Sequence, residues 1–325
     1  MKPINLDSLF VIFGGTGDLT HRKLIPAIYN LHYEGRLPDN FAVVSIGRRD
    51  KSQEEYKQDL YEAVQNFSRF AMNDELWESI ASRIYYYRMD FTDTTKYPEL
   101  KRYLDQLANK HQTKGNQIFY LAVAPEYFEP IVKSLKLNLL EDSKDFWQRV
   151  VIEKPFGRDL KSAIKLNETI VDAFTEENTY RIDHYLGKEM LQNLLVIRFA
   201  NLLFEPLWNK DYIEQVQLSS SETIGVEKRG PYYEQAGAIR DMFQSHMLQM
   251  LSLIAMEPPT SISPEAIRDA KVNVLRQLKR MDKEMIKQNV VRGQYDQSSD
   301  GTLPAYRDEE RVSPTSNTET YVAIT

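Results

Sequence analysis

Hydrophobic and polar positions along the first half of the chain form alternating blocks that predict strands and helices in turn. Patterns with helical spacing lie over 52–66, 95–110 and 127–140. Continuous apolar runs, which are typical of strands buried on both faces, lie around them. These runs are LFVIF (9–13), FAVVSIG (41–47), IYYYRMDF (84–91), QIFYLAVA (117–124) and RVVIE (149–153). The alternation predicts an α/β fold with an N-terminal Rossmann-like, doubly wound parallel sheet.

The second half of the chain opens with RIDHYLGKEM (181–190), which follows a helical pattern over 159–175 and a short β-prone stretch. Further along, an apolar stripe predicts one helix over 232–256. A length of 325 residues suits two domains. We therefore predict domains at 1–178 and 179–325.

Composition restricts the class of protein. The chain is 42% hydrophobic and 27% charged, and its longest apolar runs are much shorter than a membrane span. A net charge of −6 argues against bulk attraction to nucleic acid. The absence of cysteine excludes disulfides, thiolate catalysis and cysteine-ligated metals, and the N-terminus lacks a signal-peptide pattern. We expect a cytoplasmic protein that binds neither nucleic acid nor membrane.

A glycine-rich turn, GGTGDL (14–19), joins the first strand to the first helix. Glycines there let backbone N–H groups approach a pyrophosphate at the helix N-terminus. Gly15 and Gly17 occupy the first two glycine positions of the G-x-G-x-x-G/A motif. Thr20 stands at the third position, where the motif has Gly or Ala. The turn predicts a dinucleotide site, and the alternative is a tight turn without a ligand. The expected cofactor contacts are Gly14, Gly15, Thr16, Gly17, Asp18 and Leu19.

Two strand ends carry further candidate contacts. The second strand ends in Arg48 and Arg49, with the first acid at Asp50, which favours the 2′-phosphate of NADP and leaves NAD as a weaker alternative. A solvated basic strand end is the competing interpretation. Lys154, in EKPFG (153–157), follows another strand and is placed to meet a substrate, unless it is a surface lysine beside a turn proline.

RIDHYLGKEM concentrates several polar functions before a helical run. If 179–184 is extended, Asp183 and His184 point to opposite sides and have separate roles. Lys188, at the start of the helix, could hold a phosphate together with His184 and Tyr185. Alternatively, the acid caps the helix, the tyrosine belongs to the core and the lysine is solvated.

Among five histidines, His184 and His246 are the better candidates for chemistry. His246 and Asp241 are five positions apart in the predicted helix 232–256 and need not pair. His246 would act as a general base only if a distant acid oriented it, and it is otherwise structural. The sequence contains no metal-binding, P-loop or G-x-S-x-G motif, so we predict no metal site.

Six segments resemble the glucose-6-phosphate 1-dehydrogenase family, in the family's order. They are IFGGTGDLTHRKL (12–24), VIEKPFGRDL (151–160), RIDHYLGKE (181–189), IRDMFQSHMLQ (239–249), NVVRGQY (289–295) and SNTETYVA (316–323). The resemblance implies oxidation of glucose 6-phosphate to 6-phosphogluconolactone by NADP, the first step of the oxidative pentose phosphate pathway. Other sugar oxidoreductases that share the Glu-Lys-Pro strand end would lack RIDHYLGKE.

The same resemblance implies roles for individual residues. His246 is the base and Asp183 orients it. The residues implied for the substrate are Lys154, His184, Tyr185, Lys188, Glu222 and Asp241. Those implied for NADP are the 14–20 turn, Lys23, Arg48, Asp90, the 122–124 strand end and Lys154.

The family resemblance also predicts an α+β second domain with a large, mainly antiparallel sheet. Family members continue beyond Thr325 through strands that complete this sheet, so we expect a C-terminally truncated member with an incomplete sheet. A homodimer or higher homo-oligomer is expected for the full-length family. The alternative function is an inactive form that only binds NADP or sugar phosphate.

Overall fold

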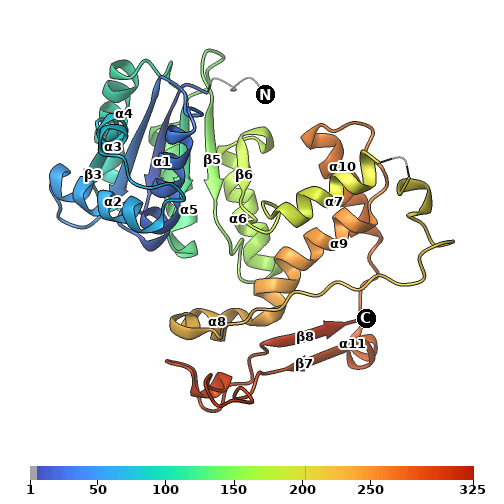
Figure 1. The fold of residues 1–325 in the computed structure, drawn as a ribbon. Coiled ribbons are helices and arrows are strands. Elements are labelled where there is room, and N and C mark those ends of the chain that lie inside the picture. Colours follow the sequence, from blue (N-terminus) through green and yellow to red (C-terminus); the bar gives the residue numbers. More distant parts are fainter. Residues whose placement is uncertain (1–5, 202) are drawn as a thin grey trace. The chain divides into compact units, whose positions relative to one another are not determined.

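The computed structural model describes residues 6–201 and 203–325, and it divides into two compact units, Met1–Ile182 and Asp183–Thr325 (Figure 1). The short strand that follows residue 178 pairs within the first unit. The domain boundary at 178/179 stays a prediction.

The first unit is built on a six-stranded sheet in the order β3-β2-β1-β4-β5-β6, and every neighbouring pair is parallel. The strands are β1 (Ser8–Phe13), β2 (Phe41–Gly47), β3 (Ile84–Arg88), β4 (Gln117–Leu121), β5 (Gln148–Ile152) and β6 (Thr179–Arg181). This order is that of the doubly wound dinucleotide-binding fold. The predicted fold class is therefore confirmed.

Helices cover both faces of the sheet. They are α1 (Ile25–Tyr33), which continues a π-helical turn η1 (Thr20–Leu24), α2 (Gln53–Phe67), α3 (Asp74–Ala81), α4 (Tyr97–Lys110), α5 (Phe128–Asn138) and α6 (Leu160–Ala173). The first three α-helices pack on one face and the last three on the other. The eight-residue α3 was not predicted, because a helix this short buries few residues, among them Trp77 and Ile80. So few apolar positions do not establish a helical period.

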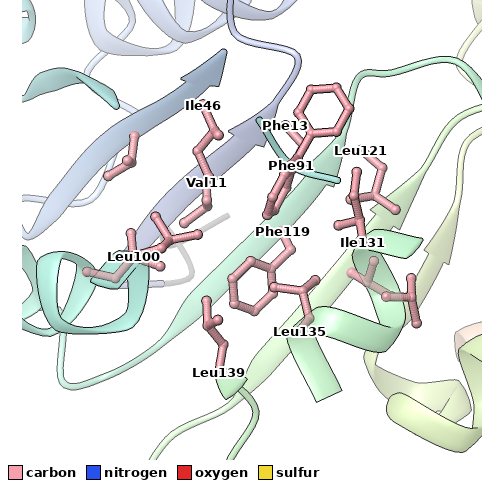
Figure 2. Close-up of a cluster of buried hydrophobic side chains, with 14 of the residues drawn as sticks. Val11, Phe13, Ile46, Phe91, Leu100, Phe119, Leu121, Ile131, Leu135 and Leu139 are labelled. Atoms are coloured by element: carbon pink, nitrogen blue, oxygen red, sulfur yellow. The ribbon is translucent and has the colours of Figure 1, made fainter. Parts of the chain in front are cut away.

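Side-chain alternation along β1 divides the core between the two faces. Val11 and Phe13 join the cluster beneath α4 and α5, and Figure 2 shows Phe13 near Phe91 and Leu121. Ile12 joins the opposite cluster beneath α1 and α2. Because β1 is buried on both faces, it holds the glycine turn at its carboxyl end in a fixed position.

The second unit is mainly helical. Its helices are α7 (Glu189–Phe199), α8 (Gly230–Ala238), the π-helix η7 (Ile239–Met247), α9 (Leu248–Ala255), α10 (Pro264–Gln277) and α11 (Lys283–Asn289). β7 (Val290–Gly293) and β8 (Tyr321–Ile324) form an antiparallel pair. The expected large antiparallel sheet is thus limited to two strands in the part of the chain that the structure describes.

The single helix predicted over 232–256 is wrong. Gly237 has φ 69° and ψ 170°, which interrupts the helical path, and the chain continues as a π-helix before returning to α9. The apolar positions expected to form a core stripe are mostly half-buried, with Met250 buried, while the buried residues of η7 are Asp241 and His246. The apolar period also did not show the wider turn.

Short 3₁₀ turns connect these elements. They are η2 (Thr94–Lys96), η3 (Pro125–Tyr127), η4 (Glu176–Asn178), η5 (Glu205–Leu207), η6 (Glu227–Arg229) and η8 (Tyr306–Asp308). Over 6–201 and 203–325, no helix has both the length and the apolar content needed to cross a membrane.

Candidate active site

The glycine turn after β1 is packed too closely for side chains. Gly14 has φ +97°, and a Cβ there would lie 2.2 Å from the Ala122 carbonyl oxygen at the end of β4. A Cβ on Gly15 would lie 2.6 Å from the Ser45 Cβ of β2. The turn leads directly into a helix, whose first N–H groups have no intrahelical acceptor and can bind an anion.

Thr20 fits the turn by a hydrogen bond, although the motif usually has Gly or Ala at its position. It is fully buried, and its hydroxyl donates to the Gly14 carbonyl oxygen at 3.0 Å. The buried Tyr56 hydroxyl donates to the Gly15 carbonyl oxygen at 2.8 Å. Both contacts hold the turn from the helical side, and the contribution of Tyr56 was not predicted because it comes from α2.

The other predicted cofactor residues lie at the same edge of the sheet. Arg48 follows β2, and its guanidinium lies over the rings of Phe91 and Tyr127, 5.4 and 5.7 Å from their centroids. The exposed Asp90 follows β3 and accepts hydrogen bonds from the Thr92 amide and hydroxyl, which lower the pKa of this carboxyl. Lys23 is exposed on η1.

Lys154 follows β5 and is partly buried. It is joined to Pro155 by a cis peptide bond. The preceding Glu153 accepts a hydrogen bond from the hydroxyl of Tyr120 on β4. Burial and the Glu153 carboxylate both raise the pKa of that tyrosine. Glu153 is thus engaged with the neighbouring strand, while Lys154 stands at the carboxyl edge of the sheet.

The conformation considered for 179–184 is extended only at its start, because the segment after β6 turns sharply. β6 ends at Arg181, and a turn covers 184–187. The Asp183 carboxylate accepts a hydrogen bond from the Tyr185 amide at 2.9 Å, which stabilises the turn. Lys188 is the N-cap of α7, as its position before the apolar run predicted.

Asp183 and His246 form a short hydrogen bond of 2.6 Å between Oδ1 and Nδ1. The His246 side chain is 0% exposed and that of Asp183 is 14% exposed. Burial disfavours the charged carboxylate, but the hydrogen bonds from His246 and the Tyr185 amide outweigh it, so the pKa of Asp183 is lowered. The distant acid that His246 needs is therefore present, 63 positions earlier in the chain.

Three further predicted residues surround this pair. The Tyr185 ring stacks on the His246 ring at 4.1 Å, and the exposed His184 meets His246 edge-on at 4.6 Å. The Lys188 ammonium lies 3.5 Å from the centroid of the Tyr185 ring. Charge and hydrogen-bond donors thus gather at the start of α7, where an anion is favoured.

The Tyr185 hydroxyl connects this cluster to Glu222. It lies 3.1 Å from the Ser220 hydroxyl and donates to the Glu222 carboxylate at 3.2 Å. Ser220 was not predicted, because nothing in the local pattern SSSET distinguishes one serine from its neighbours.

Asp241 is buried on η7 and accepts a hydrogen bond from the Tyr232 hydroxyl at 2.9 Å. Burial and the Asp241 charge raise the pKa of Tyr232. In a π-helix the backbone hydrogen bonds join residues five apart, so Asp241 and His246 are separated by one such turn. Glu319 accepts from the Ala238 amide through its backbone oxygen and from the Ile239 amide through its carboxylate, which fixes the start of η7.

Asp183, His184 and His246 offer ligand atoms within 4.8 Å of one another, a spacing that would suit a metal ion. His246 is far from Asp183 and His184 in the sequence, so no contiguous metal-binding motif joins the three residues. The hydrogen bond between Asp183 and His246 gives both side chains a partner without an ion. The arrangement is equally that of a general base oriented by a carboxylate.

Comparisons with known proteins agree across the whole chain. Glucose-6-phosphate 1-dehydrogenase of Bacillus subtilis is 48% identical over 318 residues, which are 97% of this chain and 64% of that protein. The relative from Chlamydia muridarum, of the same name, is 45% identical and is covered to 63%. The chain thus spans slightly less than two thirds of the length of these curated relatives.

Solved structures and family models give the same result. A structure titled glucose-6-phosphate dehydrogenase in complex with its substrate glucose-6-phosphate matches with a TM-score of 0.89 and 36% identity, over 100% of this chain and 66% of that one. The family model described as glucose-6-phosphate dehydrogenase, NAD binding domain, matches residues 11–193, and that described as the C-terminal domain matches 195–325. The chain belongs to the glucose-6-phosphate dehydrogenase family.

Proposed function

We propose that this chain oxidises glucose 6-phosphate to 6-phosphogluconolactone with NADP as the oxidant. The observation that carries the proposal is the hydrogen bond between Asp183 and His246, beside a cluster of anion-binding side chains. The family membership and the substrate-bound relative support the same activity.

In this proposal, His246 is the general base. Its Nδ1 is bonded to Asp183, so Nε2 is the ring nitrogen that takes the proton from the C1 hydroxyl of the sugar. Asp183 stays ionised because its pKa is lowered, and its charge stabilises the imidazolium that forms. The stacked Tyr185 ring keeps the imidazole in one orientation.

Phosphate binding is assigned to the side chains around this base. His184, Tyr185 and Lys188 bind the phosphate through charge and hydrogen bonds. Lys154, Glu222 and Asp241 bind the sugar hydroxyls. Binding energy from the phosphate, remote from C1, holds the reacting carbon in place.

The first unit is suited to hold NADP. At Gly14 and Gly15 a Cβ would collide with the Ala122 carbonyl oxygen and the Ser45 side chain, so the tight turn of the dinucleotide motif requires glycine there. Arg48 would bind the 2′-phosphate, while the 14–20 turn, Lys23, Asp90 and Lys154 would contact the rest of the dinucleotide. Bound NADP supplies the acceptor for the hydride that leaves C1. NAD remains a weaker alternative. A cytoplasmic location remains a prediction for this chain, and a homodimer or higher homo-oligomer remains a prediction for the full-length family.

The test is the absorbance of NADPH formed by the purified chain with NADP and either glucose 6-phosphate or glucose. We expect turnover with the phosphorylated sugar and little or none with glucose. If NADP and glucose 6-phosphate both bind in calorimetry and no NADPH forms, the oxidoreductase proposal is wrong and the chain is a binding form only.

A further inference from the structure

Asp50 and Arg88 form an ion pair where β2 and β3 end. The Arg88 Nη1 lies 2.8 Å from the Asp50 Oδ1. Gly47, the last residue of β2, is the register partner of Arg88, the last residue of β3. Both side chains therefore leave the sheet at its carboxyl edge, where this fold binds dinucleotides.

The neighbouring cleft, of about 440 Å³, is lined by Arg48, Tyr87, Arg88, Met89, Asp90, Asp93, Lys96 and Glu99. Its acidic side chains are engaged locally. Asp90 accepts from Thr92, Asp93 accepts from Thr95, and Glu99 lies 3.7 Å from the Lys96 ammonium. With Asp50 paired to Arg88, the acids at this edge all have partners.

Arg48 differs from these groups. Its guanidinium packs between two aromatic rings, and within the described parts of the chain it forms no ion pair. Its positive charge is shared only through space with Asp90, whose carboxylate is hydrogen-bonded to Thr92, so the guanidinium suits a dianionic phosphate. A second carboxylate close in the sequence is Asp50, two positions after Arg48.

We propose that Arg88 is a cofactor-specificity residue, which selects NADP over NAD by holding the Asp50 carboxylate. An acid at this strand end is the group that usually accepts hydrogen bonds from the ribose hydroxyls of NAD, and it repels a 2′-phosphate. The ion pair occupies the acid and neutralises its charge. The proposal rests on the dinucleotide site proposed above and adds the determinant of its selectivity.

The test is a double-mutant cycle on dinucleotide binding, measured by calorimetry with NADP and with NAD. Arg88→Gln releases Asp50, so the ratio of NADP to NAD affinity should fall about fivefold, because an exposed pair is modest in strength. Asp50→Asn alone should not lower the ratio, since it removes the acid that Arg88 neutralises and leaves a positive charge at this edge. The double variant should recover the ratio of the unsubstituted chain, because it removes both charges of the pair.

A matched control is Arg36→Gln, which breaks another exposed pair, with Glu34 at 3.1 Å, before β2 begins. It should leave the ratio unchanged. An unchanged ratio in Arg88→Gln would overturn the proposal. A double variant as poorly selective as Arg88→Gln would also overturn it, because Arg88 would then act on the cofactor directly. Failure of the unsubstituted chain to bind either dinucleotide would instead overturn the proposed function together with this inference.

Discussion

At the scale of single residues, the account depends on a few polar side chains whose neighbours decide their chemistry. His246 is completely buried, yet its imidazole has an ionised partner in Asp183 and an aromatic neighbour in Tyr185. A buried histidine without such a partner would be an ordinary core residue. The contacts, rather than the residue type, make His246 a candidate base.

Asp183→Asn should destabilise the folded chain in a pH-dependent way. Removing one partner of a charge-assisted hydrogen bond costs about 1.5–3 kcal/mol at neutral pH. The folded pKa of Asp183 lies below its ordinary value of 3.8, so the extra stability is present above that pH and is lost as the pH falls through the folded pKa. Urea titrations of the unsubstituted chain and of Asp183→Asn, from neutral pH down through the folded pKa of Asp183, measure the difference in unfolding free energy. A difference in unfolding free energy that grows on acidification would contradict the assignment.

Lys188→Ala should weaken glucose 6-phosphate binding roughly tenfold or more, the loss expected for a charged hydrogen bond to phosphate. Binding of unphosphorylated glucose should not change. Calorimetric titrations with glucose 6-phosphate and with glucose measure the two affinities. Lys287→Ala is the control, since that exposed lysine pairs with Glu284 on α11. An equal loss for both sugars would remove Lys188 from the phosphate site.

At the scale of elements, the ends of β1 and β2 and the π-helix η7 position the candidate groups. The strands and most helices of the first unit followed from apolar runs and their spacing, because burial on both faces leaves a continuous signal. The break at Gly237 and the π-helical turn did not, since the contacts that hold this segment come from Glu319, far along the chain. The contact between the Tyr185 and Ser220 hydroxyls could not be predicted either, because it joins segments that are far apart in the sequence.

Gly14→Ala should damage the dinucleotide turn far more than a comparable change elsewhere. Gly14 and Gly35 both have positive φ, +97° and +64°, so alanine strains both by about 1 kcal/mol. Only at Gly14 does the added Cβ meet a backbone oxygen, while nothing lies within 4 Å of it at Gly35. Gly14→Ala should therefore lose NADP affinity in calorimetry and Gly35→Ala should keep it. Retention of full affinity by Gly14→Ala would argue against this turn as the pyrophosphate site.

At the scale of the whole molecule, the two compact units carry different groups of candidate residues. The proposed cofactor residues, including Lys154, belong to Met1–Ile182, and the proposed base and phosphate-binding residues belong to Asp183–Thr325. The sequence alone indicated the Rossmann-like fold and the glycine turn. The pairing of His246 with Asp183 came only from the family resemblance, because residues 63 positions apart carry no local signal of contact.

The central claim is that His246 transfers the proton of the reacting hydroxyl. His246→Asn keeps a polar side chain, although a smaller one, and removes the base, so NADPH formation should fall by a factor of about 10² or more. Affinity for glucose 6-phosphate, measured by calorimetry on the same protein, should stay within about threefold. Turnover close to that of the unsubstituted chain, or loss of substrate binding equal to the loss of turnover, would contradict the account.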